Sequence, residues 1–96
     1  MNDDEIVKVL SELGNKTRLD IYRLLISYGD EGLLVGEIGK HLDIPPSTLN
    51  FHLKGLVSAE LVSQVKQSRS IVCYAQLSKL SEVLNTLQSE CCSKLS

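Results

Sequence analysis

The chain has 96 residues, of which 43% are hydrophobic and 23% charged, and its formal net charge is −2. This length suits one domain with a modest core, and the balanced composition excludes an intrinsically disordered chain. No apolar run approaches the roughly 20 residues that a membrane-spanning helix needs, and the acidic start is unlike a signal peptide. We therefore expect a cytoplasmic protein with no membrane partner, forming a single domain over residues 1–96.

Two helices are expected at the start of the chain. Residues Asp3–Leu13 have apolar side chains at helical spacing and three acidic residues in the first turn, and Gly14 should end this helix. Residues Thr17–Tyr28 show the same spacing, and the glycine-bounded run 29–32 indicates a turn. The core candidates of the second helix are Leu19, Ile21, Leu24 and Leu25.

A short third helix is expected over Leu33–Leu42, followed by a turn and a fourth helix beginning at Pro46, where the missing N–H of proline costs nothing. The apolar stripe of the fourth helix is Leu49, Leu53 and Leu56. The side chains off this stripe are polar, aromatic or cationic: Ser47, Asn50, Phe51, Lys54 and Ser58. Two short helices joined by a tight turn, the second with a polar outer face, are typical of a DNA-binding helix-turn-helix.

The hydrophobic period then changes. Residues Leu61–Lys66 and Ser70–Gln76 are rich in β-branched side chains and predict two strands joined by the cationic tip Gln67-Ser68-Arg69. A hairpin directly after a recognition helix is a wing, which can contact phosphates or a minor groove. Ser78 is expected to cap a last helix reaching about Lys94. Its predicted apolar stripe is Leu80, Val83, Leu84, Leu87 and Cys91. The predicted fold class is mainly α with a small β-hairpin, a winged helix-turn-helix of five helices plus the wing.

The charges are unevenly distributed along the chain. Residues 1–44 hold nine acids and five bases, whereas residues 45–77 hold Lys54, Lys66 and Arg69 against Glu60 alone. The basic excess therefore coincides with the predicted DNA-contacting surface, but it is small, and a monomer should bind weakly. The apolar stripes of the first and last helices exceed what a small core covers. They favour a two-fold homodimer with its recognition helices about one turn of DNA apart.

Three stretches together resemble the ArsR/SmtB family of bacterial winged-helix repressors. Residues 13–21 (LGNKTRLDI) resemble the family's opening of its second helix, residues 47–56 (STLNFHLKGL) its recognition helix, and residues 61–74 its wing, which usually closes on a tyrosine. The resemblance implies a homodimer packed through its first and last helices. It also implies binding to double-stranded operator DNA that lapses when an inducer binds, typically a metal or a thiol-reactive species.

Carried onto this chain, the resemblance implies a set of DNA contacts. The base-reading candidates are Ser47, Thr48, Asn50 and Phe51. The candidates for positioning and phosphate contact are His52, Lys54, Lys66, Gln67, Ser68 and Arg69. Asn50 would hydrogen-bond adenine while Phe51 contacts a thymine methyl group, or Phe51 would pack against the wing or the third helix. From the residues alone, Arg18 and Arg23 could reach DNA, or they could be solvated or salt-bridged, with Asp20 close by.

The family's sensing sites are mostly missing. Its Cys-x-Cys motif is replaced by residues 34–36 (LVG), and the zinc site of the last helix lacks its histidines. Cys91 and Cys92 remain, as in some arsenic-responsive members, and adjacent thiolates suit arsenite, with a third sulfur from Cys73 or from the other subunit. Alternatively, Cys91 is a buried part of the apolar stripe and Cys92 an incidental surface thiol, or the pair senses oxidants. Cys73 alone is expected to be structural.

The sequence shows no nucleophile–base pair, no glycine-rich phosphate loop and no pair of catalytic carboxylates, so an enzyme is not expected. The prediction is a sequence-specific DNA-binding transcriptional regulator of the ArsR repressor type. No cofactor is assigned, and arsenite or a similar soft ion is the candidate inducer. The alternative is a winged-helix module for protein interaction, in which Phe51 and outer leucines dock a partner protein.

Overall fold

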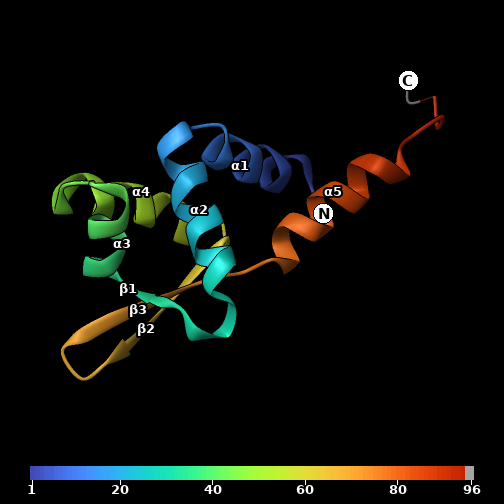
Figure 1. The fold of residues 1–96 in the computed structure, drawn as a ribbon. Helices are drawn as coiled ribbons and strands as arrows, with labels where there is room; N and C mark the ends of the chain where they lie inside the picture. The colour runs from blue at the N-terminus through green and yellow to red at the C-terminus, as the bar shows by residue number, and fades with distance from the viewer. Residues whose placement is uncertain (95–96) are drawn as a thin grey trace.

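A computed structural model describes residues 1–94 and shows a winged helix-turn-helix (Figure 1). In chain order its elements are α1 (Asp3–Leu13), α2 (Lys16–Tyr28), the 3-10 turn η1 (Gly29–Glu31), β1 (Leu33–Leu34), α3 (Val35–Leu42), α4 (Pro46–Ser58), β2 (Val62–Gln67), β3 (Ser70–Ala75) and α5 (Ser78–Ser89). The predicted fold class is confirmed. Among the described residues, no helix is both long and apolar enough to cross a membrane.

The sheet has three antiparallel strands in the order β1-β3-β2, one more than the predicted hairpin. Leu33 pairs with Cys73 and Leu34 with Val72, so the helix predicted over Leu33–Leu42 begins two residues late, at Val35. Gly32, just before β1, permits this pairing with β3, because its φ of +68° favours glycine and a Cβ there would stand 2.8 Å from the carbonyl oxygen of Cys73.

The core lies between the helices and the inner face of the sheet. The stripe Leu49, Leu53 and Leu56 is fully buried, which confirms the prediction for α4. From α2, the fully buried side chains include the predicted Ile21 and Leu25, with Leu19 and Leu24 partly covered. Tyr22 joins them without having been predicted: its hydroxyl donates to the carbonyl oxygen of Gln76 at 2.8 Å, and burial raises the pKa of the phenol.

The terminal helices lie side by side at one end of the molecule. Helix α1 has the predicted bounds and ends at Gly14. Helix α5 projects away from the body (Figure 1), although Lys79 anchors its first turn, with its Nζ 2.8 Å from Glu60 Oε2 and 3.7 Å from Glu5 Oε2. The hydrogen bond to Glu60 raises the pKa of Lys79.

The last helix differs from its prediction at both ends. Leu77, not Ser78, is the N-cap residue, and α5 ends at Ser89, short of the expected Lys94. Only Val83 of its predicted stripe is fully buried, whereas Leu84 is 47% exposed and Leu87 43% exposed. Cys91 lies beyond the helix and is exposed, so within one chain it does not continue a buried stripe. The apolar surface of α5 thus remains uncovered, as does that of α1 at Val7 and Leu10.

Candidate nucleic-acid interface

Helix α4 has two chemically different faces. Pro45 is its N-cap and Pro46 its first residue, and the leucine stripe fixes which side faces the core. The opposite side therefore faces solvent, and its exposed residues are Ser47, Thr48, Asn50, Phe51 and Lys54. Phe51 is 70% exposed, which excludes the alternative that it packs against the wing or α3 within this chain. Its ring lies edge-on to that of its neighbour His52, with centroids 5.6 Å apart.

The wing places further polar side chains beside α4. Gln67 pairs with Ser70, so the tip consists of Ser68 and Arg69 only, with Ser68 at φ +58°, instead of the predicted three residues. Lys66 pairs with Ile71 across the hairpin, and directly opposite residues share one face of a sheet. Since Ile71 lines the cleft between the wing and α4, Lys66 lies on the cleft side too.

That cleft, between α3, α4 and the wing, has a volume of about 720 Å³. Three cations from three elements line it: Lys40 of α3, Lys54 of α4 and Arg69 of the tip. Asn50 joins them from the exposed face of α4. The acid in the lining, Glu37, accepts a hydrogen bond from the backbone N–H of Leu34 at 3.0 Å. The cleft can therefore receive an anionic backbone beside a hydrogen-bonding helix face.

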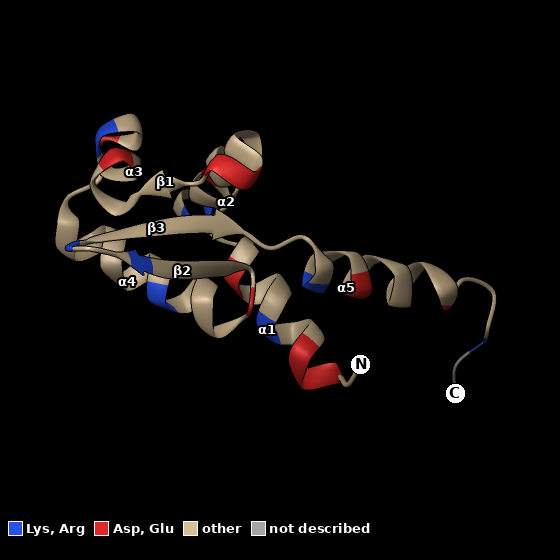
Figure 2. Cartoon of the chain, turned by 90° about the horizontal axis from the view of Figure 1, so that it is seen from below, with Lys and Arg blue, Asp and Glu red and all other residues tan. Residues whose placement is uncertain are grey.

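The distribution of charge agrees with this geometry. Figure 2 shows blue segments at the wing tip, on β2 and on α4, while the first turn of α1 is red. The first turn of α1 carries Asp3, Asp4 and Glu5, and it is the end of α1 that lies farther from the helix-turn-helix. The overall charge of −2 thus masks a locally cationic surface.

Comparison with known proteins agrees with the geometry. Residues 13–65 match the family described as a helix-turn-helix domain. A protein of Bacillus subtilis (strain 168), described as the uncharacterized HTH-type transcriptional regulator YceK, is 36% identical over 70 residues, which are 72% of this chain and 69% of that protein. An ArsR-like transcriptional regulator from Rhodococcus sp. RHA1 is 26% identical with a TM-score of 0.79, covering 90% of this chain and 78% of that one. The chain belongs to the ArsR family of transcriptional regulators.

The ArsR-family fold also extends to a more distant structure. S. aureus MepR, solved as a complex with DNA, has a TM-score of 0.66 at 17% identity, covering 85% of this chain and 71% of that one. The family consists of DNA-binding regulators and not of enzymes, in agreement with the sequence.

Sequence reasoning missed one of the three cations that line this ArsR-family cleft. Lys40 lies in the last turn of α3, where a basic residue also suits the helix dipole, so its sequence position does not point to DNA. Only the packing of α3 beside the wing brings Lys40 near Lys54 and Arg69. The candidates predicted on α4 and at the tip are exposed, except His52, which is partly buried. Their contacts with DNA stay a prediction.

Arg18 and the two histidines of this ArsR-family chain form specific contacts. Arg18 pairs with Glu12, its Nε 3.2 Å from Oε1, whereas Asp20 pairs with Lys16 at 2.7 Å. Of the alternatives for Arg18, the structure shows the salt-bridged one, with Glu12 and not the nearby Asp20 as its partner. His52 Nδ1 lies 3.4 Å from Arg18 Nη1. His41 Nε2 lies 3.4 Å from the hydroxyl of Tyr28.

The three cysteines do not come together. Cys73 is fully buried in β3, where burial raises the pKa of the thiol and a weak hydrogen bond from Gln64, at 3.6 Å, opposes the rise. Cys91 and Cys92 are exposed beyond α5, with their sulfur atoms 3.5 Å apart. Within residues 1–94 no three ligating side chains of His, Cys, Asp or Glu form a group that could hold a metal ion. The vicinal pair thus offers two sulfurs in one chain.

Proposed function

We propose that this regulator is a homodimeric repressor that binds operator DNA with α4 in the major groove and the wing on adjacent phosphates. The observation that carries the proposal is the cleft, where Asn50 on the exposed face of α4 stands beside the cations Lys40, Lys54 and Arg69. The exposed face supplies groups for base edges, and the cations supply phosphate contacts that set affinity and register. MepR, a protein of the same fold, was solved as a complex with DNA, which supports DNA binding by a chain of this fold.

The uncovered leucines of the terminal helices support the dimer. Leu10 on α1 and Leu84 and Leu87 on α5 are each more than 40% exposed, and α1 packs beside α5. A second copy related by a two-fold axis would cover the same apolar surface on both chains. It would also give two recognition helices, which compensates for the small number of cations on one chain.

The proposed DNA contacts predict two different losses. Asn50→Ala should lower affinity for the best operator about tenfold and reduce discrimination against altered base pairs. Lys66→Ala should weaken binding to all sequences alike and lower the slope of log affinity against log salt by about 1. Titration of operator variants by fluorescence anisotropy at two salt concentrations measures both.

The matched control for this titration is Lys94→Ala, which removes the same charge beyond α5, far from the cleft. It should leave discrimination and salt slope unchanged. Full discrimination by Asn50→Ala would contradict the groove assignment. Failure of the unmodified protein to bind any sequence in a random operator library would favour the alternative, in which the exposed Phe51 docks a partner protein.

The vicinal pair Cys91 and Cys92 is the proposed inducer site. Two thiolates 3.5 Å apart can bind a soft trivalent ion such as arsenite, and a second copy of the chain can supply the third sulfur. Cys73 is disfavoured as the third ligand because it is fully buried. A ligand here, just beyond α5, would act on the dimer helices and change the spacing of the two recognition helices.

Arsenite should therefore release the protein from its operator, and the double variant Cys91→Ser/Cys92→Ser should abolish this release while retaining DNA binding. Titration of arsenite into the preformed DNA complex measures the effect. Cys73→Ser is the control variant and should still respond. Release that persists in the double variant would assign the response elsewhere, and tight binding unmoved by arsenite would direct the search to oxidants.

A further inference from the structure

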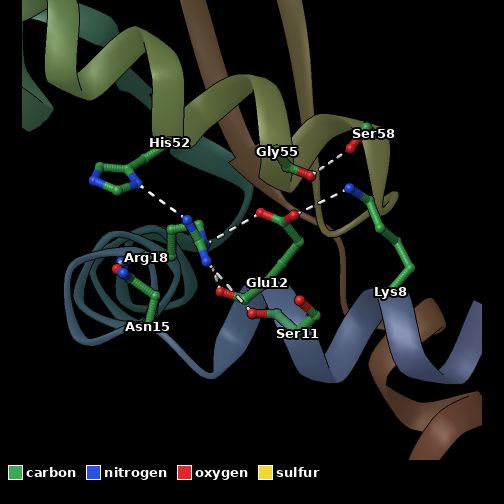
Figure 3. A network of polar contacts seen from close by, with 8 residues as sticks. All are labelled: Lys8, Ser11, Glu12, Asn15, Arg18, His52, Gly55 and Ser58. Atoms are coloured by element: carbon green, nitrogen blue, oxygen red, sulfur yellow. Dashed lines mark hydrogen bonds and ion pairs between the residues drawn. The ribbon is translucent and has the colours of Figure 1, made fainter.

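We infer that Glu12 and Arg18 are positioning residues for DNA recognition, which hold α4 in place through Gly55 and His52. The inference rests on the proposed operator binding, but its structural basis lies outside the DNA-contacting face. The four residues come from α1, α2 and α4, and Figure 3 shows the side chains of Glu12, Arg18 and His52 pointing toward one another, with the backbone of Gly55 beside them.

Glu12 forms the centre of this network. Its side chain is only 12% exposed, and its carboxylate lies 3.0 Å from Lys8 Nζ through Oε2 and 3.2 Å from Arg18 Nε through Oε1. The backbone of α4 passes directly over it at Gly55, where a Cβ atom would overlap Oε1 and stand 2.9 Å from Cδ. The absence of a side chain at Gly55 therefore permits α4 to lie against the carboxylate.

Arg18 joins three segments of the chain. Its Nε donates to the carbonyl oxygen of Glu12 at 2.7 Å, and its Nη2 lies 3.4 Å from the carbonyl oxygen of Ser11. The guanidinium thereby caps the last carbonyl groups of α1. Its Nη1 lies 3.4 Å from Nδ1 of His52 on α4. Oε1 of Glu12 has no hydrogen-bond partner, because the Nε proton of Arg18 is directed to the backbone carbonyl oxygen of Glu12. The carboxylate therefore attracts the guanidinium through its charge.

This contact determines how His52 can act. A guanidinium only donates hydrogen bonds, so Nδ1 of His52 must accept, and a neutral imidazole then carries its proton on Nε2. The Nε2–H group is left as a donor on the side chain whose ring adjoins the exposed Phe51, where a phosphate oxygen can accept it. Arg18 thus selects the tautomer and the orientation of His52 and, together with Glu12 under Gly55, the rotation of α4.

The same network connects the two proposed interfaces. Helix α1 carries the uncovered Leu10 on its surface and Glu12 two residues later, so a shift of α1 at a dimer contact would move the carboxylate under α4. The network therefore links dimer packing to recognition-helix placement through named atoms.

A double-mutant cycle on operator affinity tests the inference. Arg18→Gln should lower affinity about tenfold in the parent protein but by no more than about twofold when His52 is already replaced by glutamine, since Arg18 acts through His52. Additive losses would overturn it. The matched control, Asp20→Asn, breaks the exposed Lys16–Asp20 pair on the same helix and should leave affinity unchanged. An equal loss in that control would also overturn the inference.

A second variant and a second measurement cover the remaining cases. Should Arg18→Gln fail to fold, Arg18→Lys keeps the charge beside Glu12 but lacks the fork that reaches both Glu12 and His52, and it should show the same loss. Long-range ¹⁵N–¹H spectra of His52 need no DNA. They should show the Nε2–H tautomer in the parent protein and a mixture in Arg18→Lys, and an identical tautomer in both would overturn the inference even where operator binding itself fails.

Discussion

We expect the double variant Leu84→Glu/Leu87→Glu to be monomeric and to bind an operator with two half-sites at least about 100-fold more weakly than the parent protein. Both side chains are nearly half exposed on α5, so two carboxylates there are hydrated in the monomer and leave its fold intact. In a dimer they would be buried against an apolar surface without partners, which is strongly unfavourable. A monomer cannot hold a second recognition helix next to the second half-site, so the gain from binding both half-sites at once is lost.

Sedimentation equilibrium and titration of DNA with one or two half-sites measure this effect together. The matched control is Asn85→Glu/Gln88→Glu, which adds the same two charges to exposed polar positions one residue further along α5. It should remain dimeric. Affinity for a single half-site should be nearly equal in all three proteins. A double leucine variant that still sediments as a dimer would contradict the assignment of the interface to the terminal helices.

Leu53→Ala is expected to lower the free energy of unfolding by about 3 kcal/mol, a large share of the 5–15 kcal/mol typical of a domain. Leu53 is 1% exposed and stands in the middle of the α4 stripe. Removing its isobutyl group loses apolar burial and leaves a cavity between α4 and the rest of the core. For a domain of this length the melting temperature should fall by roughly 15 °C.

Urea unfolding followed by circular dichroism measures the change. Phe51→Ala is the matched control, because it removes an even larger side chain from the same helix at a position that is 70% exposed. Its free energy of unfolding should change by no more than about 0.5 kcal/mol. A comparable loss in Phe51→Ala would contradict the division of α4 into a core face and a solvent face.

Local spacing predicted most of the fold, because it depends on near neighbours in sequence. The stripe of α4 follows from the positions of Leu49, Leu53 and Leu56, and the start of that helix follows from Pro46. The short strand β1 was missed because Leu33 and Leu34 become a strand only through pairing with Val72 and Cys73, almost 40 residues away. Apolar content alone could not separate that pairing from the first turn of a helix.

The C-terminal end and the polar network show the same limit. Cys91 continues the apolar spacing of α5, yet the helix ends at Ser89 and Cys91 is exposed, so the spacing alone does not predict where the helix ends. The pairing of Glu12 with Arg18 was missed because Asp20 is the nearer acid in sequence. Asp20 instead pairs with Lys16, which lies four residues earlier on the same face of α2. Arg18 is therefore available to pair with Glu12 at the end of α1.

The division of α4 into two faces bears on how such regulators diverge after gene duplication. Ser47, Asn50 and Phe51 are exposed, so substitutions there should cost little in folding. On the proposed mode of binding, the same substitutions change the groups offered to base pairs. Leu49, Leu53 and Leu56 tolerate few substitutes because the core is filled around them. Two copies of the gene in one cell could therefore acquire different operators by a few surface changes while both proteins retain one scaffold.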